Sequence, residues 1–385
     1  MLRAGGYRAF VPRPLPPEPA LQTDLEMLAL LSEADQRLGR LDGAAAVLPN
    51  PDLFVGMYVR KEAVLSSQIE GTQSSLVDLL EYEAEAARRG LPPDVGEVVN
   101  YVSAMRYGLE RVQQLPLSLR LIREIHERLL AGVRGGQRRP GEFRREQVWA
   151  GARGASVREA EFVPPPTEEM NHALHDLERF LHDESPMPVL VKCALVHSQF
   201  ETIHPFLDGN GRIGRLLIAF LLCHAGVLER PLLYLSYYFK RHRDEYYARL
   251  QAVRDAGDWE GWIKFFLRAV AEVARQASEV ASRILKMHEE HRRFIAANMR
   301  TARAIRLHDF LFQAPIIPAA AAQELLGITF RSANRLVARF QELGILTQMP
   351  GGRRPRLFSY QPYVALLSEG TEPGQPPAGG ERIQT

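Results

Sequence analysis

The segment HPFLDGNGRIGR, residues 204–215, carries the densest cluster of reactive side chains in the sequence. Three glycines and an asparagine stand within it, directly before an apolar stretch, residues 215–226, whose pattern predicts a helix. The backbone N–H groups of Gly209, Asn210 and Gly211 can then converge at the start of that helix, where the macrodipole favours negative charge. The segment therefore predicts a phosphate site at a helix N-terminus.

Four side chains of the same segment suit chemistry on a polyphosphate. Arg212 and Arg215 are three residues apart and share a helix face, from which both could grip phosphate oxygens. Asp208 offers one hard oxygen ligand, which suits Mg²⁺ held partly by protein and partly by polyphosphate. His204 carries an imidazole, whose ordinary pKa near neutrality lets it accept a proton from an attacking hydroxyl.

This glycine-rich loop has three other interpretations to compare: a dinucleotide-binding fingerprint, a Walker A loop and a simple surface turn. Residues 209–214, GNGRIG, match the G-x-G-x-x-G dinucleotide fingerprint, but that motif needs a strand leading into its first glycine. The preceding residues, ETIHPFLD, contain a proline and charges, and strands do not alternate with helices around them, so the fingerprint is not favoured. The sequence contains no Gly-Lys pair, which excludes a Walker A loop. A glycine turn with surface arginines stays open on the residues alone.

Composition sets wider limits. The 385 residues are 46% hydrophobic and 24% charged, as in soluble globular proteins, and a net charge of +2 leaves nucleic-acid binding to a local patch. Two cysteines are too few for a disulfide framework. The N-terminal stretch has no apolar signal core, and nothing downstream is apolar over a bilayer's width, so we expect a cytoplasmic protein without a membrane partner.

The rest of the chain is predicted to be mainly helical. A proline-rich arm leads into helical patterns that continue to about residue 131, and helical patterns resume at residue 167. Between them lies a stretch rich in glycine, arginine and proline with two short β-prone pieces, which predicts a β-hairpin flap at about residues 143–163. An amphipathic stretch from about residue 259 to 296 is predicted to be a spacer helix.

The C-terminal part predicts a separate unit. Residues 317–348 read as helix, turn, helix, with Gly327 in the turn and Thr329 or Ser332 capping the second helix. A basic stretch with Arg353, Arg354 and Arg356 follows, like a two-stranded wing. The final residues, 366–385, are rich in proline and glycine, so we expect them to be disordered.

The loop segment resembles the signature of Fic-domain proteins, H-P-F-x-[D/E]-G-N-G-R-x-x-R. All nine specified positions of that signature are present between residues 204 and 215, and the resemblance extends over about residues 50–260. The resemblance implies a Fic-type helical core and a nucleotidyltransferase that transfers AMP from ATP to a Ser, Thr or Tyr hydroxyl of a target protein, or of itself. It also implies that the same pocket can remove AMP from a modified target.

The resemblance also implies roles for individual residues. His204 would be the general base and Asp208 the ligand of Mg²⁺ between the α- and β-phosphates, while Arg215 would meet the γ-phosphate. Tyr246 and Tyr247 look like the adenine-side tyrosines of the family. The full nucleotide-binding set implied is Asp208, Gly209, Asn210, Gly211, Arg212, Ile213, Gly214, Arg215, Tyr246 and Tyr247.

Two further features follow the family pattern. The flap would pair with an extended target segment by β-augmentation, through Gly151, Ala160, Phe162 and Val163. Residues 66–71, SSQIEG, match an inhibitory-helix pattern, [S/T]-x-x-x-E-[G/N], through Ser66, Glu70 and Gly71. Glu70 would pair with Arg215 and misalign ATP, although a glutamate at a helix end is otherwise most often a surface residue.

These interpretations divide the chain into five parts and leave a second function open. The parts are an N-terminal segment (1–110) with the inhibitory helix (about 53–71), a Fic core (111–260), a linker helix (261–298), a winged-helix domain (299–365) and a disordered tail (366–385). The alternative is a winged-helix regulator that contacts DNA through Arg331, Asn334 and Arg335, in which the Fic core senses nucleotide. The sequence leaves a homodimer open.

Overall fold

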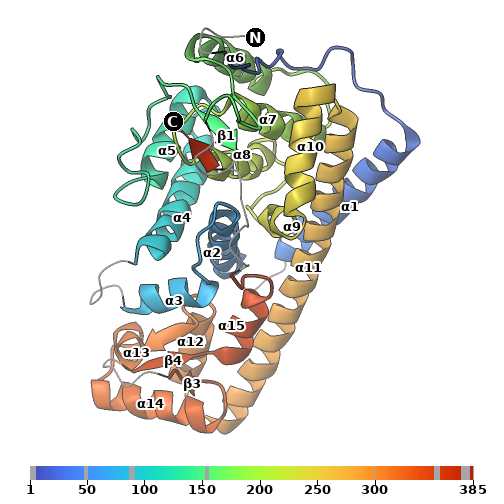
Figure 1. The fold of residues 1–385 in the computed structure, drawn as a ribbon. Helices are drawn as coiled ribbons and strands as arrows, with labels where there is room; N and C mark the ends of the chain where they lie inside the picture. Colours follow the sequence, from blue (N-terminus) through green and yellow to red (C-terminus); the bar gives the residue numbers. More distant parts are fainter. Residues whose placement is uncertain are drawn as a thin grey trace.

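The computed structural model describes residues 6–46, 51–85, 92–151, 156–299, 301–350, 356–373 and 382–384. Of the helices α1 to α10, all but α3 build the upper body in Figure 1, and α3 lies lower, next to α13. Their bounds are α1 (Leu25–Ala46), α2 (Pro51–Ile69), α3 (Leu76–Glu85), α4 (Pro93–Val112), α5 (Leu119–Leu129), α6 (Thr167–Leu181), α7 (Val189–Ile203), α8 (Asn210–His224), α9 (Ser236–Arg241) and α10 (Arg243–Ala256).

A buried helical hairpin stands at the centre of this body. Helices α7 and α8 pack against each other, and nearly all of their residues are buried, as their continuous apolar sequences predict. The loop that joins them, residues 204–209, is the signature loop. The hairpin therefore holds the reactive segment on a rigid support.

A single long helix, α11 (Trp259–Asn298), runs along the side of the molecule and continues into its lower part (Figure 1). Asp258 caps its start by accepting a hydrogen bond from the backbone N–H of Gly261 at 2.9 Å. The first half of α11 buries Trp262, Phe265 and Phe266 and packs along α1. The prediction of a linker helix at 261–298 was therefore wrong for this half, which is a core element.

The lower part of the molecule, residues 301–373 where described, is called the C-terminal unit below. Its elements are α12 (Ala302–Leu311), β2 (Ile316–Pro318), α13 (Ala319–Leu326), α14 (Phe330–Glu342), β3 (Thr347–Gln348), β4 (Leu357–Ser359) and α15 (Gln361–Ser368). The strands form an antiparallel sheet in the order β2-β4-β3. Gly327 ends α13 in the left-handed conformation, and Thr329 caps α14, as predicted.

The C-terminal unit extends beyond its predicted end. Leu366 and Leu367 of α15 and the following Thr371 are buried, so the boundary predicted for a disordered tail at residue 366 was too early. Helix α15 packs against α2 and α3, which a composition argument over the whole tail could not show. Residues 374–381 and Thr385 lie outside the described residues, as do Arg353 and Arg354 of the predicted wing.

The chain also forms a small sheet at the flap. Strand β1 (Trp149–Gly151) pairs antiparallel with β5 (Arg382–Gln384), with Ala150 opposite Ile383. On its other side Ala150 bridges Phe162, which gives the predicted hairpin. Figure 1 shows β1 and the C-terminal strand close together in the upper body. The C-terminal end of the chain is thus paired with the flap.

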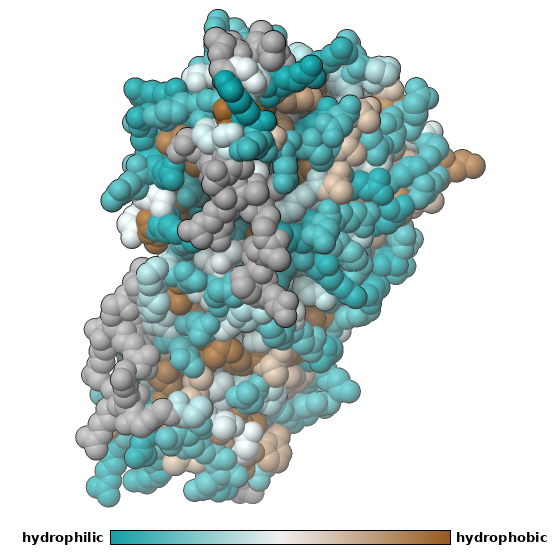
Figure 2. Space-filling view, viewed as in Figure 1, coloured by the Kyte–Doolittle hydropathy of each residue, from teal (hydrophilic) through white to brown (hydrophobic). Residues whose placement is uncertain are grey.

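Hydrophobic residues are unevenly distributed over the surface. On the face shown in Figure 2, hydrophilic residues dominate the upper body, and hydrophobic residues gather lower down, over the region of α3, α13 and α15. Within the described ranges, no helix is long and apolar enough to cross a membrane.

Candidate active site

The signature loop leaves α7 through a left-handed residue. His204 has a φ of 50°, its backbone N–H donates to the Phe200 carbonyl at 3.0 Å, and it ends α7. Gly209, with a φ of 78°, begins α8. Asn210 closes the loop, because its side chain both donates to the Phe206 carbonyl (2.8 Å) and accepts from the Phe206 N–H (2.9 Å). The loop geometry is therefore set by its own polar residues.

A cavity of about 550 Å³ opens beside this loop. Its lining includes His204, Asp208 and the backbone of residues 209–211, which is the first turn of α8. Residues 133–138 and Glu70 also line the cavity. The predicted base, the predicted metal ligand and the helix N-terminus therefore share one cavity.

The surroundings of His204 favour its neutral form. Burial, together with the charge of Arg144, lowers the pKa of His204 to about 3, so the ring is neutral near pH 7. Its Nδ1 lies 3.3 Å from the Glu201 carbonyl oxygen. A proton on Nδ1 would make this hydrogen bond and would leave the lone pair of Nε2 to act as a base.

Asp208 fits one ligand position of a Mg²⁺ ion. Its side chain is 37% exposed, and one carboxylate oxygen, Oδ1, accepts from Arg212 Nη2 at 3.1 Å. The other, Oδ2, lies close to Gly135, where a β-carbon would come within 2.8 Å of it. A partly exposed hard oxygen at the edge of this cavity has the chemistry that Mg²⁺ requires.

Arg212 differs from Arg215 in its partners. Its side chain is buried, and Nη1 donates to Glu97 Oε2 of α4 at 3.0 Å. Glu97 also meets Arg134 at 3.1 Å, while burial raises the pKa of this glutamate despite both arginines. Arg212 thus connects the loop aspartate to α4, and it is one of the residues that line the cavity.

Glu70 pairs with Arg215, as predicted. Glu70 follows the last residue of α2, and its Oε1 accepts from Arg215 Nη2 at 2.6 Å. The guanidinium also donates from Nε to Ser66 Oγ at 2.8 Å and from Nη2 to the Ser66 carbonyl at 3.1 Å. Burial opposes ionisation of Glu70, but the charge and hydrogen bond of Arg215 outweigh it and lower the pKa of Glu70.

The Glu70 carboxylate lies against the first turn of α8. A β-carbon on Gly211 would come within 2.2 Å of Glu70 Oε1, so only glycine leaves room for this contact. Gly71, with a φ of 96°, turns the chain after the glutamate. A carboxylate thus occupies the helix N-terminus where an anion is favoured.

The remaining nucleotide-binding predictions have mixed outcomes. Ile213 and Gly214 are buried in α8, and a β-carbon on Gly214 would meet Glu201 Oε1 at 2.3 Å. The geometry gives both a packing role. Tyr246 is also buried: its hydroxyl bonds His197 Nε2 at 2.9 Å, and its ring stacks on Phe239.

Tyr246 is therefore a core residue, and the prediction that it faces adenine does not agree with its burial. The residues that line the cavity include neither Tyr246 nor Tyr247. Tyr247 is half-buried, and an adenine contact for it stays a prediction. His197 bonds Gly214 and Tyr246 through its two ring nitrogens, as expected of a structural histidine.

The flap residues predicted to meet a target have other partners. Phe162 and Val163 are buried, and the Arg254 guanidinium stacks on the Phe162 ring at 3.8 Å. The Val163 carbonyl accepts from the N–H of Phe10 in the N-terminal arm at 2.9 Å. Gly151 belongs to β1, which pairs with β5, and Ala160 is half-buried beside it. Both outer edges of the flap are thus in contact with the chain itself.

Three residues of the site were not predicted from the sequence. Arg144 is buried and donates to the carbonyls of His204, Glu146 and Pro165, which ties the flap to the base. Glu97 is the partner of Arg212, and Glu201 is buried close to Arg215, with its pKa raised to about 7 by burial. Glu97 has a signal, since it is a charge within the apolar stripe of α4, whereas Arg144 is one of several arginines in the same stretch.

A half-buried histidine stands beside a glycine loop at a helix N-terminus, within a helical body. The model of the Fic/DOC family N-terminal domain matches residues 28–110, and that of the Fic/DOC family matches residues 116–222. Residues 28–222 belong to the Fic/DOC family.

Curated relatives and solved structures agree with this assignment. The chain is 32% identical over 187 residues to protein adenylyltransferase Fic of Drosophila ananassae and 31% identical to that of Drosophila melanogaster. The match covers 48% of this chain and 33% or 34% of those relatives, so the chain matches about one third of their length.

Two structures share the fold. A Fic family protein from Desulfovibrio desulfuricans aligns with a TM-score of 0.57 at 20% identity, covering 88% of this chain and 97% of that one. Fic-1 of C. elegans aligns with a TM-score of 0.50 at 22% identity, covering 68% and 74%.

Proposed function

We propose that this protein is an adenylyltransferase that transfers AMP from ATP to a Ser, Thr or Tyr hydroxyl of a target protein. The observation that carries the proposal is the shared cavity: neutral His204, the carboxylate of Asp208 and the N-terminal turn of α8 face one space. The likeness to proteins named protein adenylyltransferase Fic supports the same activity.

In the proposed reaction, His204 removes the proton of the target hydroxyl. The hydroxyl oxygen forms a bond to the α-phosphorus of ATP while the bond to the β-phosphate oxygen breaks, and pyrophosphate leaves. The backbone N–H groups at the start of α8 hold the phosphates, and Asp208 would hold Mg²⁺, which would neutralise phosphate charge. Run on a modified target with water, the same groups would remove AMP.

We further propose that Glu70 restrains this reaction. Arg215 is the arginine expected to bind the γ-phosphate, yet its side chain is 2% exposed and its donors point to Glu70 and Ser66. The Glu70 carboxylate also fills space beside Gly211. ATP would then bind with its α-phosphate out of line for attack until Glu70 leaves.

Labelling with α-labelled ATP tests the activity. Wild type and the Glu70→Gly variant are incubated with Mg²⁺ and each α-labelled nucleoside triphosphate, and the modified chain is located by mass spectrometry. His204→Ala should abolish labelling, whereas His175→Ala, an exposed histidine on α6, should not change it. Labelling that persists in His204→Ala would overturn the assignment of the base.

A second proposal concerns the C-terminal unit. The order of its elements and its antiparallel sheet support a winged-helix interpretation, and Arg331, Asn334 and Arg335 are exposed on α14. This face could contact DNA phosphates and bases. A salt-dependent mobility shift with the full chain tests it, and the absence of a shift at low salt would remove the hypothesis.

A further inference from the structure

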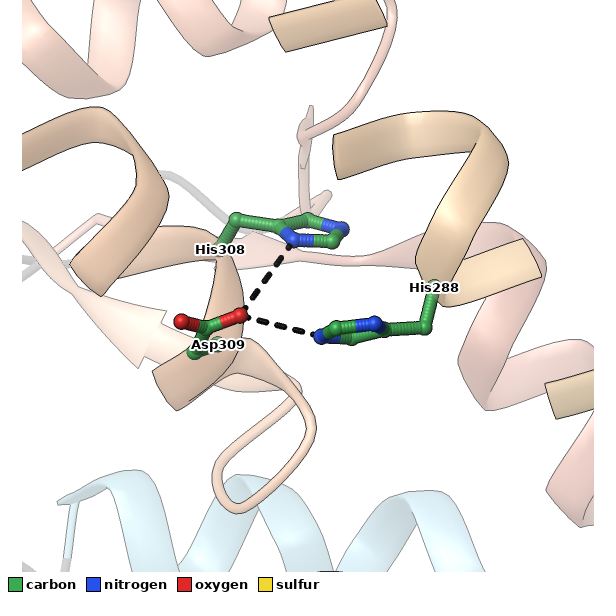
Figure 3. A group of neighbouring side chains, drawn as sticks. All are labelled: His288, His308 and Asp309. Carbon is green, nitrogen blue, oxygen red and sulfur yellow. Dashed lines mark hydrogen bonds and ion pairs between the residues drawn. The ribbon is translucent and has the colours of Figure 1, made fainter. Parts of the chain in front are cut away.

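Three side chains form a compact group where α11 meets α12, far along the chain from the signature loop. His288 extends from α11, and His308 and Asp309 extend from α12, with both rings facing the carboxylate (Figure 3). Asp309 Oδ1 lies 2.9 Å from His288 Nε2 and 3.9 Å from His308 Nδ1. One ligand atom of each residue lies within 4.8 Å of the others.

His308 is a buried polar side chain that lacks hydrogen bonds. The residue is 0% exposed, and within the described part of the chain neither of its ring nitrogens has a hydrogen-bond partner. Buried polar atoms are nearly always hydrogen-bonded, because desolvation without a partner is unfavourable. An ion bound between His308 and Asp309 would satisfy the nitrogen that faces the carboxylate.

Aromatic rings enclose His308. The rings of Phe312 and Tyr360 meet the imidazole edge-on, with centroids 5.3 and 6.1 Å from that of His308. The side chain is therefore shielded from water, so its two unpaired ring nitrogens are unfavourable unless a ligand meets one of them.

Asp309 has one competing partner. Arg292 Nη1 donates to both carboxylate oxygens, at 3.0 and 3.1 Å. This contact orients the carboxylate, as hydrogen bonds to metal-binding side chains do in many metal sites. The positive charge of Arg292 also lowers the affinity of the group for a cation. The nearby His291 is engaged elsewhere, since its Nδ1 lies 2.6 Å from the Tyr360 hydroxyl.

We propose that this group binds one divalent transition-metal ion of the zinc type, through His288 Nε2, His308 Nδ1 and an oxygen of Asp309. Two imidazoles with one carboxylate suit zinc, whereas Mg²⁺ and Ca²⁺ prefer oxygen ligands alone. Ligands of a tetrahedral zinc ion lie about 3.4 Å apart, and the two distances to Asp309 bracket that value.

The ion would join two parts of the molecule. His288 belongs to the long helix α11, and the other two ligands belong to the first helix of the C-terminal unit. Binding would therefore fix the angle at which the C-terminal unit leaves α11, and the fourth position would be left to water. The role is structural and is independent of nucleotide transfer.

The test uses the untagged full chain, stripped with a chelator and without nucleotide. Co²⁺ is added as a spectroscopic probe and Zn²⁺ is titrated by calorimetry. We expect one Co²⁺ per chain with visible d–d bands, displacement by Zn²⁺, and a rise in melting temperature of about 3–6 °C at a hundred times the Kd. His288→Gln, a partly exposed position, and Asp309→Asn should each lose binding at least tenfold.

A matched control removes two other imidazoles. His172 and His175 are exposed on α6, so the His172→Gln/His175→Gln double variant should bind Co²⁺ as wild type does. His308→Gln should also lose the bands, and its far-ultraviolet circular dichroism checks that it is folded. Wild type that binds no Co²⁺, or binding that survives His288→Gln and Asp309→Asn, would overturn the proposal.

Discussion

At the scale of single residues, the position of Glu70 is unfavourable for one helix and favourable for another. A carboxylate just past the C-terminus of α2 is disfavoured by the dipole of that helix by about 0.3–1 kcal/mol. It lies, however, at the N-terminus of α8, where a dipole favours it, and within 2.6 Å of a buried guanidinium. The tertiary contact outweighs the local cost, and so a position that is unfavourable in one helix is stabilised by another.

Removing the Glu70 carboxylate should activate the enzyme. Glu70→Gly removes the carboxylate from Arg215 Nη2 and from the space beside Gly211. The restrained state then loses a buried ion pair, which we expect to destabilise that state by more than about 1.4 kcal/mol, a factor of ten. We therefore expect AMP transfer, including self-modification, to rise at least about tenfold, measured as incorporation of α-labelled ATP. Glu70→Gln, which keeps the shape without the charge, should lie between.

The control for this prediction is Glu168→Gln, an exposed acid on α6. It should leave transfer unchanged. Equal activity of wild type and Glu70→Gly, with His204→Ala still inactive, would show that Glu70 is not a restraint while leaving the activity itself intact.

The pH dependence of transfer should report the environment of His204. Because burial and Arg144 lower the pKa of this imidazole to about 3, the base stays unprotonated as pH falls through 6.5, the ordinary value. The negative charge of Glu70 raises the same pKa, so the Glu70→Gly variant shifts it further down. We expect kcat/KM of this variant to stay flat from pH 8 to about 6. An acid limb centred near 6.5 would contradict the prediction.

At the scale of elements, both outer edges of the flap are hydrogen-bonded to other segments of the chain. Phe10 of the arm pairs beside Val163, and β5 pairs along β1. An extended target segment that adds a strand needs free backbone donors and acceptors. The arm is also held by Gln199 Nε2 of α7, which donates to the Arg13 carbonyl at 2.7 Å. The edge of β1 is therefore the one that a target could reach, by displacing β5.

Deleting residues 374–385 should raise modification of an added target. The truncation removes β5 and exposes the backbone of β1, which has three residues in register with β5. We expect the apparent KM for the target to fall several-fold in a Glu70→Gly background, with unchanged KM for ATP. A KM for the target that is unchanged or higher after truncation would show that β5 does not compete.

At the scale of the whole molecule, the C-terminal unit contacts the end of α2, the helix that directly precedes Glu70. Gln68, two residues before Glu70, donates from Nε2 to the Ser74 carbonyl at 2.8 Å and to the Thr371 carbonyl at 2.9 Å. Lys240 of α9 donates to Gln68 Oε1 at 2.6 Å and to the Glu372 carbonyl at 2.7 Å. The end of α2 is thus held in place by the segment after α15.

Loosening this contact should weaken the restraint. Gln68→Ala removes the side-chain donor of the Ser74 and Thr371 carbonyls and one of the two acceptors of Lys240. This should cost about 1–3 kcal/mol of stability and let the turn that carries Glu70 move. We expect a lower melting temperature together with higher basal transfer than wild type. Gln73→Ala, an exposed glutamine in the same turn, is the matched control and should change neither. A destabilised Gln68→Ala with wild-type transfer would contradict the coupling.

Some features of this protein were determined by short stretches of sequence. The glycine loop of residues 204–215, the cap at Thr329 and the turn at Gly327 depend on residues within a few positions of one another, so their types and spacing suffice to predict them. The predicted pairing of Glu70 with Arg215, 145 residues apart, came from family resemblance and not from the local pattern.

Other features were decided only when the chain packed. The burial of Arg144 and Tyr246, the pairing of Arg212 with Glu97, the core role of α11 and the strand that covers the flap depend on which elements meet. So does the group formed by His288, His308 and Asp309, whose members extend from two helices. Hydrophobic periodicity shows which side of a helix is buried, but it does not show which other element that side packs against. The partners of a buried polar group are therefore fixed by tertiary contacts, because desolvation leaves each such group dependent on whatever neighbour packing brings to it.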